Sequence, residues 1–327
     1  MNLEKMPLVA VKIPVYNSES TIVALIDSLL NQTYKNIVIY IFDNCSTDQT
    51  QSLIESYNQA NIIYARNSEN YGWNYNFNKC LVDTGEDFLL IAHADDIYGK
   101  RFIEYNLRAH KDSKCGLIFS QGLSFRTSNP IVAQFESEEL EIEVYNHKKL
   151  YEEICINGNF LYCPTAFGEM ISISKLIGRF DGDNFAGSAD MDAWLRFSLT
   201  NEIALIKNTG LFYHRISSTQ LSTLERKVSI NYFDKCLRSF YDDTNQAHLK
   251  LNDYILWHDV FHQVVCQLYS NDRNNTLLGC LIKAVKLKVS LLKKIKLSVF
   301  IVLVQSVNLC PNSLRNYLRK KLLNYIR

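Results

Sequence analysis

Short hydrophobic runs alternate with amphipathic segments over the first hundred residues of the chain. Apolar runs of strand length occur at residues 8–13, 37–42, 62–65 and 88–92. Helical spacing of apolar residues follows the first run, at Ile22, Leu25, Ile26, Leu29 and Leu30. Further helices are predicted around residues 49–57 and 73–81. Strands that alternate with helices in this way predict an α/β fold, in which helices cover both faces of a mostly parallel sheet.

The apolar pattern breaks directly after three of the predicted strands. Residues 14–17 follow the first strand, residues 43–48 the second and residues 93–96 the fourth. In open α/β sheets, ligands bind outside the carboxyl ends of the strands. We therefore expect these three segments to line one binding site.

Two adjacent carboxylates, Asp95 and Asp96, stand just beyond the apolar run at residues 88–92. Neighbouring carboxylates repel each other unless a hard cation lies between them and other oxygen ligands, and Mg²⁺ or Mn²⁺ with a substrate phosphate meets that need. The pattern therefore indicates chemistry on a nucleotide. The alternative is a solvated strand end, where Asp96 caps a helix that begins after residues 99–101.

Five motifs occur in a fixed order along the first hundred residues. They are Pro14-Val15-Tyr16-Asn17, residues 28–34, Asp43 with Ser46-Thr47-Asp48, Asn70-Tyr71-Gly72 leading to Asn78, and Asp95-Asp96-Ile97. An acidic stretch at residues 180–183 precedes the segment 189–196. Together these motifs resemble glycosyltransferase family 2, which has the GT-A fold. The resemblance implies transfer of a sugar from a nucleotide-sugar donor to an acceptor hydroxyl, with inversion at the anomeric carbon.

The resemblance also implies roles for individual residues. Asp190 matches the general base, which takes the proton of the acceptor hydroxyl as it attacks the sugar carbon; alternatively, Asp190 only caps the following helix. Asp43 is expected to accept a hydrogen bond from the imide N–H of uracil or thymine. Asp95 and Asp96 are expected to hold Mn²⁺ or Mg²⁺, which neutralises charge on the departing nucleoside diphosphate. The other residues expected to bind the donor nucleotide are Pro14, Tyr16, Asn17, Asn78, His93, Ala94 and Arg215, together with Asp95.

Three positions depart from the family pattern. His93 replaces the first acid of the usual Asp-x-Asp, Ala189 replaces the acid before the base position, and Ser217 stands where a histidine is common. His214 could replace that histidine only if the loop shifts, while Arg215 still offers a planar donor to a phosphate. The departures leave the affinity for the metal and its identity open.

The charge is unevenly distributed along the 327 residues. The net charge is +1, yet residues 273–327 hold twelve Lys or Arg and no Asp or Glu. A basic amphipathic helix is predicted there, with Lys283, Lys286, Lys293 and Lys294 on one side. Such a helix favours attachment to an anionic membrane surface, and the alternative is a helical subdomain packed on the catalytic domain. Nucleic-acid binding is not expected, because the tail lacks a groove-reading motif or an aromatic stacking platform.

The start of the chain and its cysteines bear on the compartment. No charged segment with an apolar core precedes the first predicted strand, so no signal peptide is expected. The nine cysteines are scattered and lack Cys-x-x-Cys spacing, which indicates neither a zinc site nor a disulfide framework. We expect a cytoplasmic protein, whose tail is a candidate for attachment to the inner face of the plasma membrane.

These observations predict a glycosyltransferase domain over residues 1–222, with a nucleotide-sugar half at 1–98 and an acceptor half at 99–222. A helical region follows at residues 223–327. The expected substrates are a UDP- or dTDP-sugar and a saccharide or lipid-linked saccharide, in bacterial surface polysaccharide or glycolipid assembly. Two alternatives stay open. One is an inactive GT-A-like scaffold that binds nucleotide or membrane; the other is a sugar-phosphate nucleotidylyltransferase, which would need a Gly-rich basic loop after the first strand.

Overall fold

The computed structural model describes residues 6–125, 139–157, 159–216, 235–237 and 239–240. The chain forms two compact units, Met1–Leu237 and Arg238–Arg327. All helices and strands given below belong to the first unit. The basic tail with its predicted membrane-binding helix, Ser217 and the predicted boundary at residue 222 lie outside the described residues, so those predictions stay predictions.

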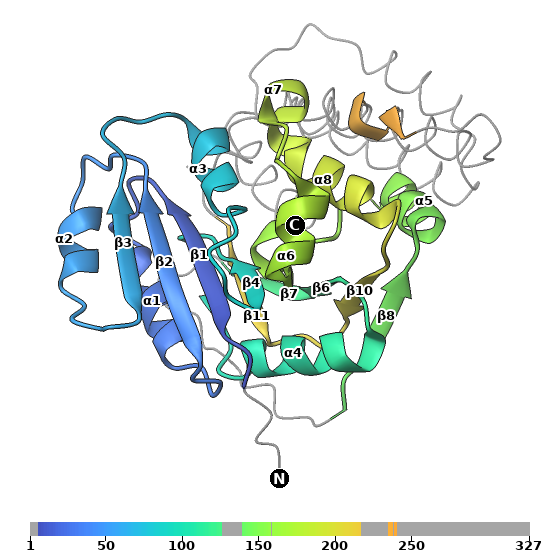
Figure 1. Cartoon of the computed structure of the whole chain (residues 1–327), viewed down its shortest axis with the longest axis horizontal. Coiled ribbons are helices and arrows are strands. Elements are labelled where there is room, and N and C mark those ends of the chain that lie inside the picture. The colour runs from blue at the N-terminus through green and yellow to red at the C-terminus, as the bar shows by residue number, and fades with distance from the viewer. Residues whose placement is uncertain (1–5, 126–138, 158, 217–234, 238, 241–327) are drawn as a thin grey trace, which may run out of the picture. The chain divides into compact units, whose positions relative to one another are not determined.

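An eight-stranded sheet forms the centre of the first unit (Figure 1). Its strand order is β3-β2-β1-β4-β9-β6-β10-β8. The strands are β1 Val9–Val15, β2 Ile37–Asp43, β3 Ile62–Arg66, β4 Phe88–Ile91, β6 Leu117–Ser120, β8 Ile142–Tyr145, β9 Phe167–Glu169 and β10 Ile203–Ile206. The pairs β3–β2, β2–β1, β1–β4 and β6–β10 are parallel, while β9 and β8 run antiparallel to their neighbours. The predicted α/β fold with a mostly parallel sheet is confirmed.

Helices pack against this sheet and connect its strands. They are α1 Ile22–Leu30, α2 Thr50–Glu55, α3 Trp73–Lys79, α4 Phe102–Ser113, α5 His147–Asn157, α6 Met170–Ser172, α7 Gly182–Phe185 and α8 Ala189–Ser198. Single turns of other helix types lie at η1 Cys163–Thr165, η2 Ile173–Ile177 and η3 Ala186–Ser188. Helix α3 contacts β1 and β2, and α4 contacts β6 and β10. Among the described residues, no helix is both long and apolar enough to cross a bilayer.

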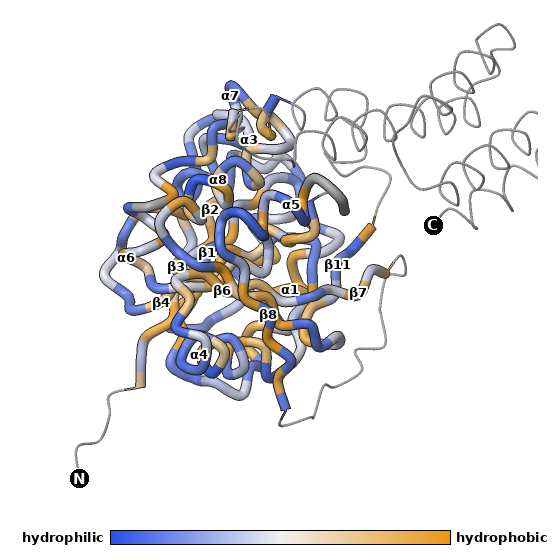
Figure 2. Tube along the Cα trace, turned by 90° about the vertical axis from the view of Figure 1, so that its right-hand side faces the viewer, coloured by the Kyte–Doolittle hydropathy of each residue, from blue (hydrophilic) through white to orange (hydrophobic). Residues whose placement is uncertain are grey.

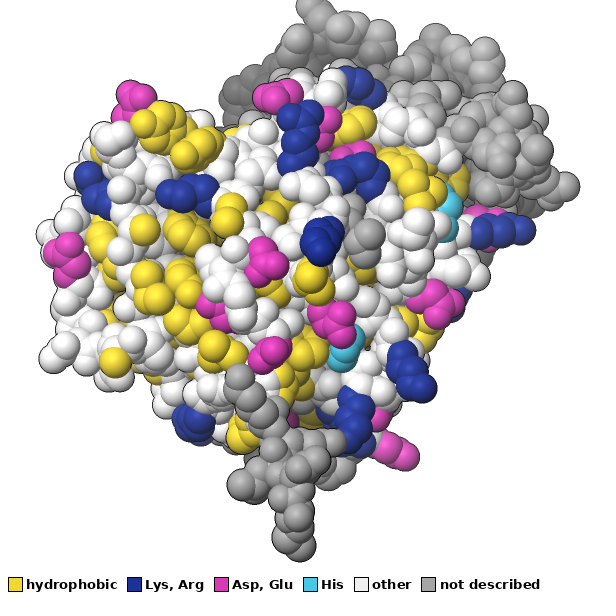
Figure 3. All heavy atoms as spheres, in the orientation of Figure 1, with side chains coloured by type: hydrophobic (Ala, Val, Ile, Leu, Met, Phe, Trp, Pro, Cys, Tyr) yellow, Lys and Arg dark blue, Asp and Glu magenta, His cyan; other side chains and the backbone are white. Residues whose placement is uncertain are grey.

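The hydrophobic pattern of the sequence explains where the core lies. All seven residues of β1 are buried, as expected for a central strand that is covered on both faces. Helix α1 buries Ile22, Leu25, Ile26 and Leu29, the same positions whose spacing predicts the helix. In Figure 2 the hydrophobic stretches run along the strands. Positive and negative side chains are mixed over the face shown in Figure 3, which is typical of a solvated surface.

A second, three-stranded sheet brings distant parts of the chain together. It has the order β5-β11-β7, with β5 Ile97–Tyr98, β7 Gly122–Phe125 and β11 Phe212–Arg215. Strand β11 pairs antiparallel with β5 and parallel with β7. Asp96 directly precedes β5, so the pairing of β5 with β11 brings the end of β11 close to Asp95 and Asp96.

Candidate active site

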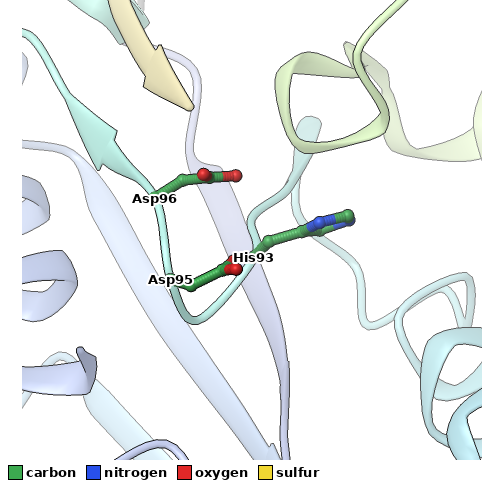
Figure 4. A group of neighbouring side chains, drawn as sticks. All are labelled: His93, Asp95 and Asp96. Atoms are coloured by element: carbon green, nitrogen blue, oxygen red, sulfur yellow. The ribbon is translucent and has the colours of Figure 1, made fainter. Parts of the chain in front are cut away.

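The loop between β4 and β5 carries a cluster of three side chains that could bind a metal. His93, Asp95 and Asp96 each offer one ligand atom, and these atoms all lie within 4.8 Å of one another. Figure 4 shows that the three side chains leave the loop toward the same side. The loop that follows β4 therefore holds two carboxylates and one imidazole close together, at the strand end that the sequence predicts.

Asp96 is buried, and only one of its two carboxylate oxygens has hydrogen-bond partners. Its side chain is buried, with the residue only 1% exposed, and Oδ1 accepts hydrogen bonds from His214 Nδ1 at 3.1 Å and from the Arg215 backbone N–H at 2.9 Å. Oδ2 is buried and has no hydrogen-bond partner. Burial raises the pKa of Asp96 to about 6, although the hydrogen bond from His214 acts in the opposite direction. A buried oxygen without a partner is costly unless a ligand satisfies it.

His93 has a similar unsatisfied atom. Its Nε2 is buried without a hydrogen-bond partner, and its ring meets the edge of Phe77 with 5.1 Å between centroids and 89° between planes. Burial lowers the pKa of His93 to about 4, against the charge of Asp95. The imidazole is therefore neutral at neutral pH, which is the form that binds metal ions.

The carboxyl ends of the neighbouring parallel strands β1 and β2 lie side by side, as the sequence predicts for strands of one parallel sheet. The Asn17 backbone N–H donates to Ser46 Oγ at 2.9 Å, and the Thr47 N–H donates to Asn17 Oδ1 at 2.8 Å. Asn17 adopts a positive φ of 47°, as does Cys45 with 65°. Pro14 is buried within β1, Ala94 is half-buried on the loop after β4, and Tyr16 is 45% exposed. Their predicted contacts with a donor nucleotide stay predictions.

Asp43 is fully buried, and its carboxylate already has several partners. Oδ1 accepts from the Ser46 N–H and hydroxyl at 3.0 and 2.6 Å, while Oδ2 accepts from the Tyr64 hydroxyl at 2.7 Å and pairs with Arg66 Nε at 3.3 Å. Tyr64 and Arg66 lie on β3, and the sequence analysis did not single them out. The hydrogen bond that Asp43 is expected to accept from the imide N–H of a pyrimidine base stays a prediction, and the carboxylate would have to accept it in addition to the bonds from these partners.

Asn78, on α3, joins that helix to the segment that leads into α7. Its Oδ1 accepts from the Phe180 backbone N–H at 2.8 Å, and its Nδ2 donates to the Phe180 carbonyl at 3.1 Å. Asn74, one turn earlier, accepts from the Gly182 N–H at 3.2 Å. The predicted contact of Asn78 with the donor stays a prediction, and the structure gives its side chain backbone partners that the sequence did not indicate.

Asp190 lies in the first turn of α8. Its Oδ1 accepts from the Met191 backbone N–H at 2.7 Å, and its Oδ2 accepts from Asn159 Nδ2 at 3.3 Å. Burial raises the pKa of Asp190 to about 6, against the effect of these hydrogen bonds. A carboxylate with a pKa near neutrality is suited to take a proton from a hydroxyl group.

Aromatic contacts connect the loop between β4 and β5 to the helix that carries Asp190. Phe77 meets both His93 and Phe180, and Phe180 in turn meets Trp194 of α8 at 5.8 Å between centroids. Trp194 is fully buried and also packs edge-on against Phe119. The loop and α8, separated by about a hundred residues in sequence, therefore share one packed core.

Comparison with known proteins identifies the family. The model of glycosyl transferase family 2 matches residues 10–176, about half of the chain. The chain belongs to glycosyltransferase family 2, as the motifs around Asp43 and Asp95 indicate.

Sequence relatives include an uncharacterised glycosyltransferase of Rickettsia prowazekii, 30% identical over 234 residues that make up 67% of this chain and 69% of the relative. A Bacillus subtilis protein named as the teichuronic acid biosynthesis glycosyltransferase TuaG is 23% identical over 68% of this chain and 84% of its own length. The match to a related protein of Rickettsia typhi spans only 58% of that protein.

Solved structures agree on the fold. The S. aureus protein TarS, crystallised as residues 1–349 with UDP-GlcNAc, matches with a TM-score of 0.56 at 18% identity, over 97% of this chain and 88% of the crystallised 1–349 chain. The mannosyltransferase PcManGT of Pyrobaculum calidifontis, solved with GDP-Man and Mn²⁺, matches with a TM-score of 0.58 at 14% identity, over 98% and 86%. The GT-A fold is confirmed.

Proposed function

We propose that this protein transfers a sugar from a nucleotide-sugar donor to a hydroxyl group of a saccharide or lipid-linked saccharide, with inversion, in bacterial surface polysaccharide assembly. The observation that carries the proposal is the buried carboxylate of Asp96, which keeps an unpartnered oxygen next to Asp95 and His93 at the carboxyl end of β4. Family membership supports sugar transfer. The named role of TuaG and the nucleotide sugars in the TarS and PcManGT crystals support the donor class and the setting.

The donor side of the site suits a divalent cation. Asp95 and Asp96 would hold it, because two carboxylates with an unsatisfied buried oxygen match the ligands of Mg²⁺ or Mn²⁺. When bound, the ion neutralises charge on the departing nucleoside diphosphate. Arg215 donates through Nε to the Asp95 carbonyl at 2.8 Å, which places its guanidinium beside the loop that would face the phosphates.

The acceptor side depends on Asp190. Its raised pKa lets the carboxylate accept the proton of the acceptor hydroxyl as that oxygen attacks the sugar carbon. We propose UDP- or dTDP-sugars as donors. We also propose that residues 1–222 act as the catalytic domain, with a cytoplasmic location and a tail that binds the inner membrane face.

A donor-hydrolysis assay tests this function. Purified protein is incubated with UDP-GlcNAc, UDP-Glc, a dTDP-sugar or GDP-Man, with and without Mn²⁺, and released nucleoside diphosphate is measured. Release from a UDP- or dTDP-sugar that needs the cation and disappears in Asp190→Asn supports the proposal. Metal-dependent nucleotide binding without release of diphosphate in any condition would instead favour the inactive scaffold. Formation of nucleotide sugar from a sugar phosphate and a nucleoside triphosphate would favour the nucleotidylyltransferase.

For an active donor, proton NMR of the first product resolves inversion from retention at the anomeric carbon. A product with the same anomeric configuration as the donor would refute the inverting mechanism and would leave sugar transfer intact.

A further inference from the structure

The loop after β4 offers an imidazole nitrogen where two carboxylates alone would suffice for a hard cation. His93 lies two residues before Asp95, and its ligand atom lies within 4.8 Å of those of both Asp95 and Asp96. The loop therefore offers one imidazole and two carboxylates from a stretch of four residues.

The structure restricts the orientation of the His93 side chain. Phe77 packs edge-on against the imidazole, and Phe77 itself is fixed by edge contacts with Trp73 and Phe180. A ring held by packing needs little reorganisation when it binds an ion, which favours tight coordination.

A purely structural histidine would normally satisfy both of its ring nitrogens. His93 Nε2 is instead buried without a hydrogen-bond partner, as is Asp96 Oδ2. The two unpartnered atoms thus come from two of the three residues in the cluster. A ligand shared by His93 and Asp96 explains both, whereas a role in packing alone explains neither.

We propose that the His93 imidazole is a direct ligand of the metal ion and makes the site prefer a first-row transition-metal dication over Mg²⁺. This inference rests on the proposed function, because it concerns the metal of the same site. Mg²⁺ is a hard ion that favours oxygen ligands and gives up its waters reluctantly. Imidazole nitrogen suits the transition ions, whose affinity for mixed nitrogen and oxygen sites rises from Mn²⁺ to Co²⁺ and Ni²⁺. Replacing a carboxylate by a neutral ring also removes one negative charge, which weakens binding of Mg²⁺ most.

Spectroscopy of the unmodified protein provides a direct test. Pulsed EPR of Mn²⁺ bound to the full-length chain is expected to show hyperfine coupling to a nitrogen nucleus, which changes when the histidines are labelled with ¹⁵N. The coupling should vanish in His93→Ala and persist in His214→Asn, a control in which the amide keeps a donor near the position of the Nδ1 that contacts Asp96. Absence of nitrogen coupling in the wild type, or its loss in His214→Asn alone, would overturn the inference.

Metal titrations give a second measure that does not depend on activity. Loss of a direct ligand should weaken Mn²⁺ binding by at least the roughly 10- to 100-fold that loss of a supporting hydrogen bond causes at metal sites. We therefore expect His93→Ala to bind Mn²⁺ about tenfold more weakly or worse, and His93→Asp to shift the ratio of Mn²⁺ to Mg²⁺ affinity toward Mg²⁺ by a similar factor. Circular dichroism checks that both variants remain folded.

The titrations also separate this inference from the proposed function. If His93→Ala binds Mn²⁺ as well as the wild type while the wild type still releases UDP from UDP-GlcNAc, the ligand role is wrong and sugar transfer stands. If no nucleotide sugar releases its diphosphate although Mn²⁺ shows nitrogen coupling, the ligand role stands and the proposed function fails.

Discussion

Replacing Asp190 by Asn should abolish sugar transfer and at the same time stabilise the protein at alkaline pH. The first effect follows because an amide cannot take the proton of the acceptor hydroxyl. The second follows from burial, which raises the pKa of Asp190 from its ordinary value of 3.8 to about 6. If Asp190 were retained only for packing, its replacement by Asn would not lower the activity and raise the stability at the same time.

The pKa of Asp190 sets the size and the pH range of the effect. Because the folded state binds the proton more tightly than the unfolded state, the stability that this group contributes is fully present below pH 3.8 and is lost as the pH rises through about 6. A shift of about two pKa units corresponds to roughly 3 kcal/mol. Asn avoids that penalty but must replace the hydrogen bonds to Met191 and Asn159, so we expect a net gain of about 1–2 kcal/mol at pH 8.

Urea unfolding at pH 8 and at pH 4 measures the prediction. Asp48→Asn serves as a control, because the pKa of Asp48 is shifted in the opposite direction. Partial burial raises the pKa of Asp48, but hydrogen bonds from Thr50 and Glu19 outweigh that effect and lower the pKa below its ordinary value. The stability contributed by Asp48 is present above its unfolded pKa and is lost as the pH falls through its folded pKa. Asp48→Asn should therefore destabilise the protein at pH 8 and matter less at pH 4, while the gain from Asp190→Asn should shrink at pH 4.

The rate of transfer gives an independent check on the same group. The logarithm of kcat/KM should fall with a slope of one as the pH drops below about 6, since the base must be ionised in the free enzyme. Transfer that survives in Asp190→Asn, or a loss of stability at pH 8 like that of Asp48→Asn, would refute the assignment of Asp190 as a half-buried base with a raised pKa.

Three further substitutions test other parts of the site. Asn78→Ala removes two hydrogen bonds to the Phe180 backbone and should cost about 2 kcal/mol in urea unfolding; an equal effect from Asn31→Ala, which loses one exposed bond to Asp27, would contradict this. Cys45→Val should destabilise the protein by on the order of 1 kcal/mol, because φ is 65° and a β-branched side chain fits that backbone less well than Cys, whereas Cys45→Gly should not, as thermal unfolding of both variants would reveal. Asp96→Asn should weaken Mn²⁺ binding in calorimetry by about tenfold or more, with near-native circular dichroism, and unchanged affinity would rule out Asp96 as a ligand.

The sequence predicts the first half of the fold well because the hydrophobic pattern there is local. The apolar stripe at residues 22–30 and the apolar pattern of β1, which only Lys12 interrupts, each specify one element without help from the rest of the chain. The second half is harder to predict. Strand β9 has three residues, and it lies between β4 and β6, where pairing across the sheet rather than local pattern decides its conformation.

Sequence motifs also locate the carboxyl ends of the strands better than they identify contacts made there. Asp95 and Asp96 lie just after β4, at the strand end where the pattern predicts that a molecule binds. The partners of Asp96, however, come from β11, 118 and 119 residues later, through a strand pairing that no local pattern indicates. For the same reason the sequence does not reveal that Asn78 contacts Phe180, a residue 102 positions away.

Hydrogen-bond capacity distinguishes two groups among the residues that the motifs single out. Asp43 is buried with both oxygens bonded to protein groups, so its carboxylate first of all fixes the loop at residues 43–48 and its junction with β3. His93 is half-buried and Asp96 is buried, yet each keeps a buried atom without a partner. Because burying an unsatisfied polar atom costs about 1–3 kcal/mol, a fold retains two of them in one loop most readily where a bound ligand compensates for them. The unsatisfied atoms, more than membership in a motif, therefore carry our proposal that the loop after β4 binds an ion.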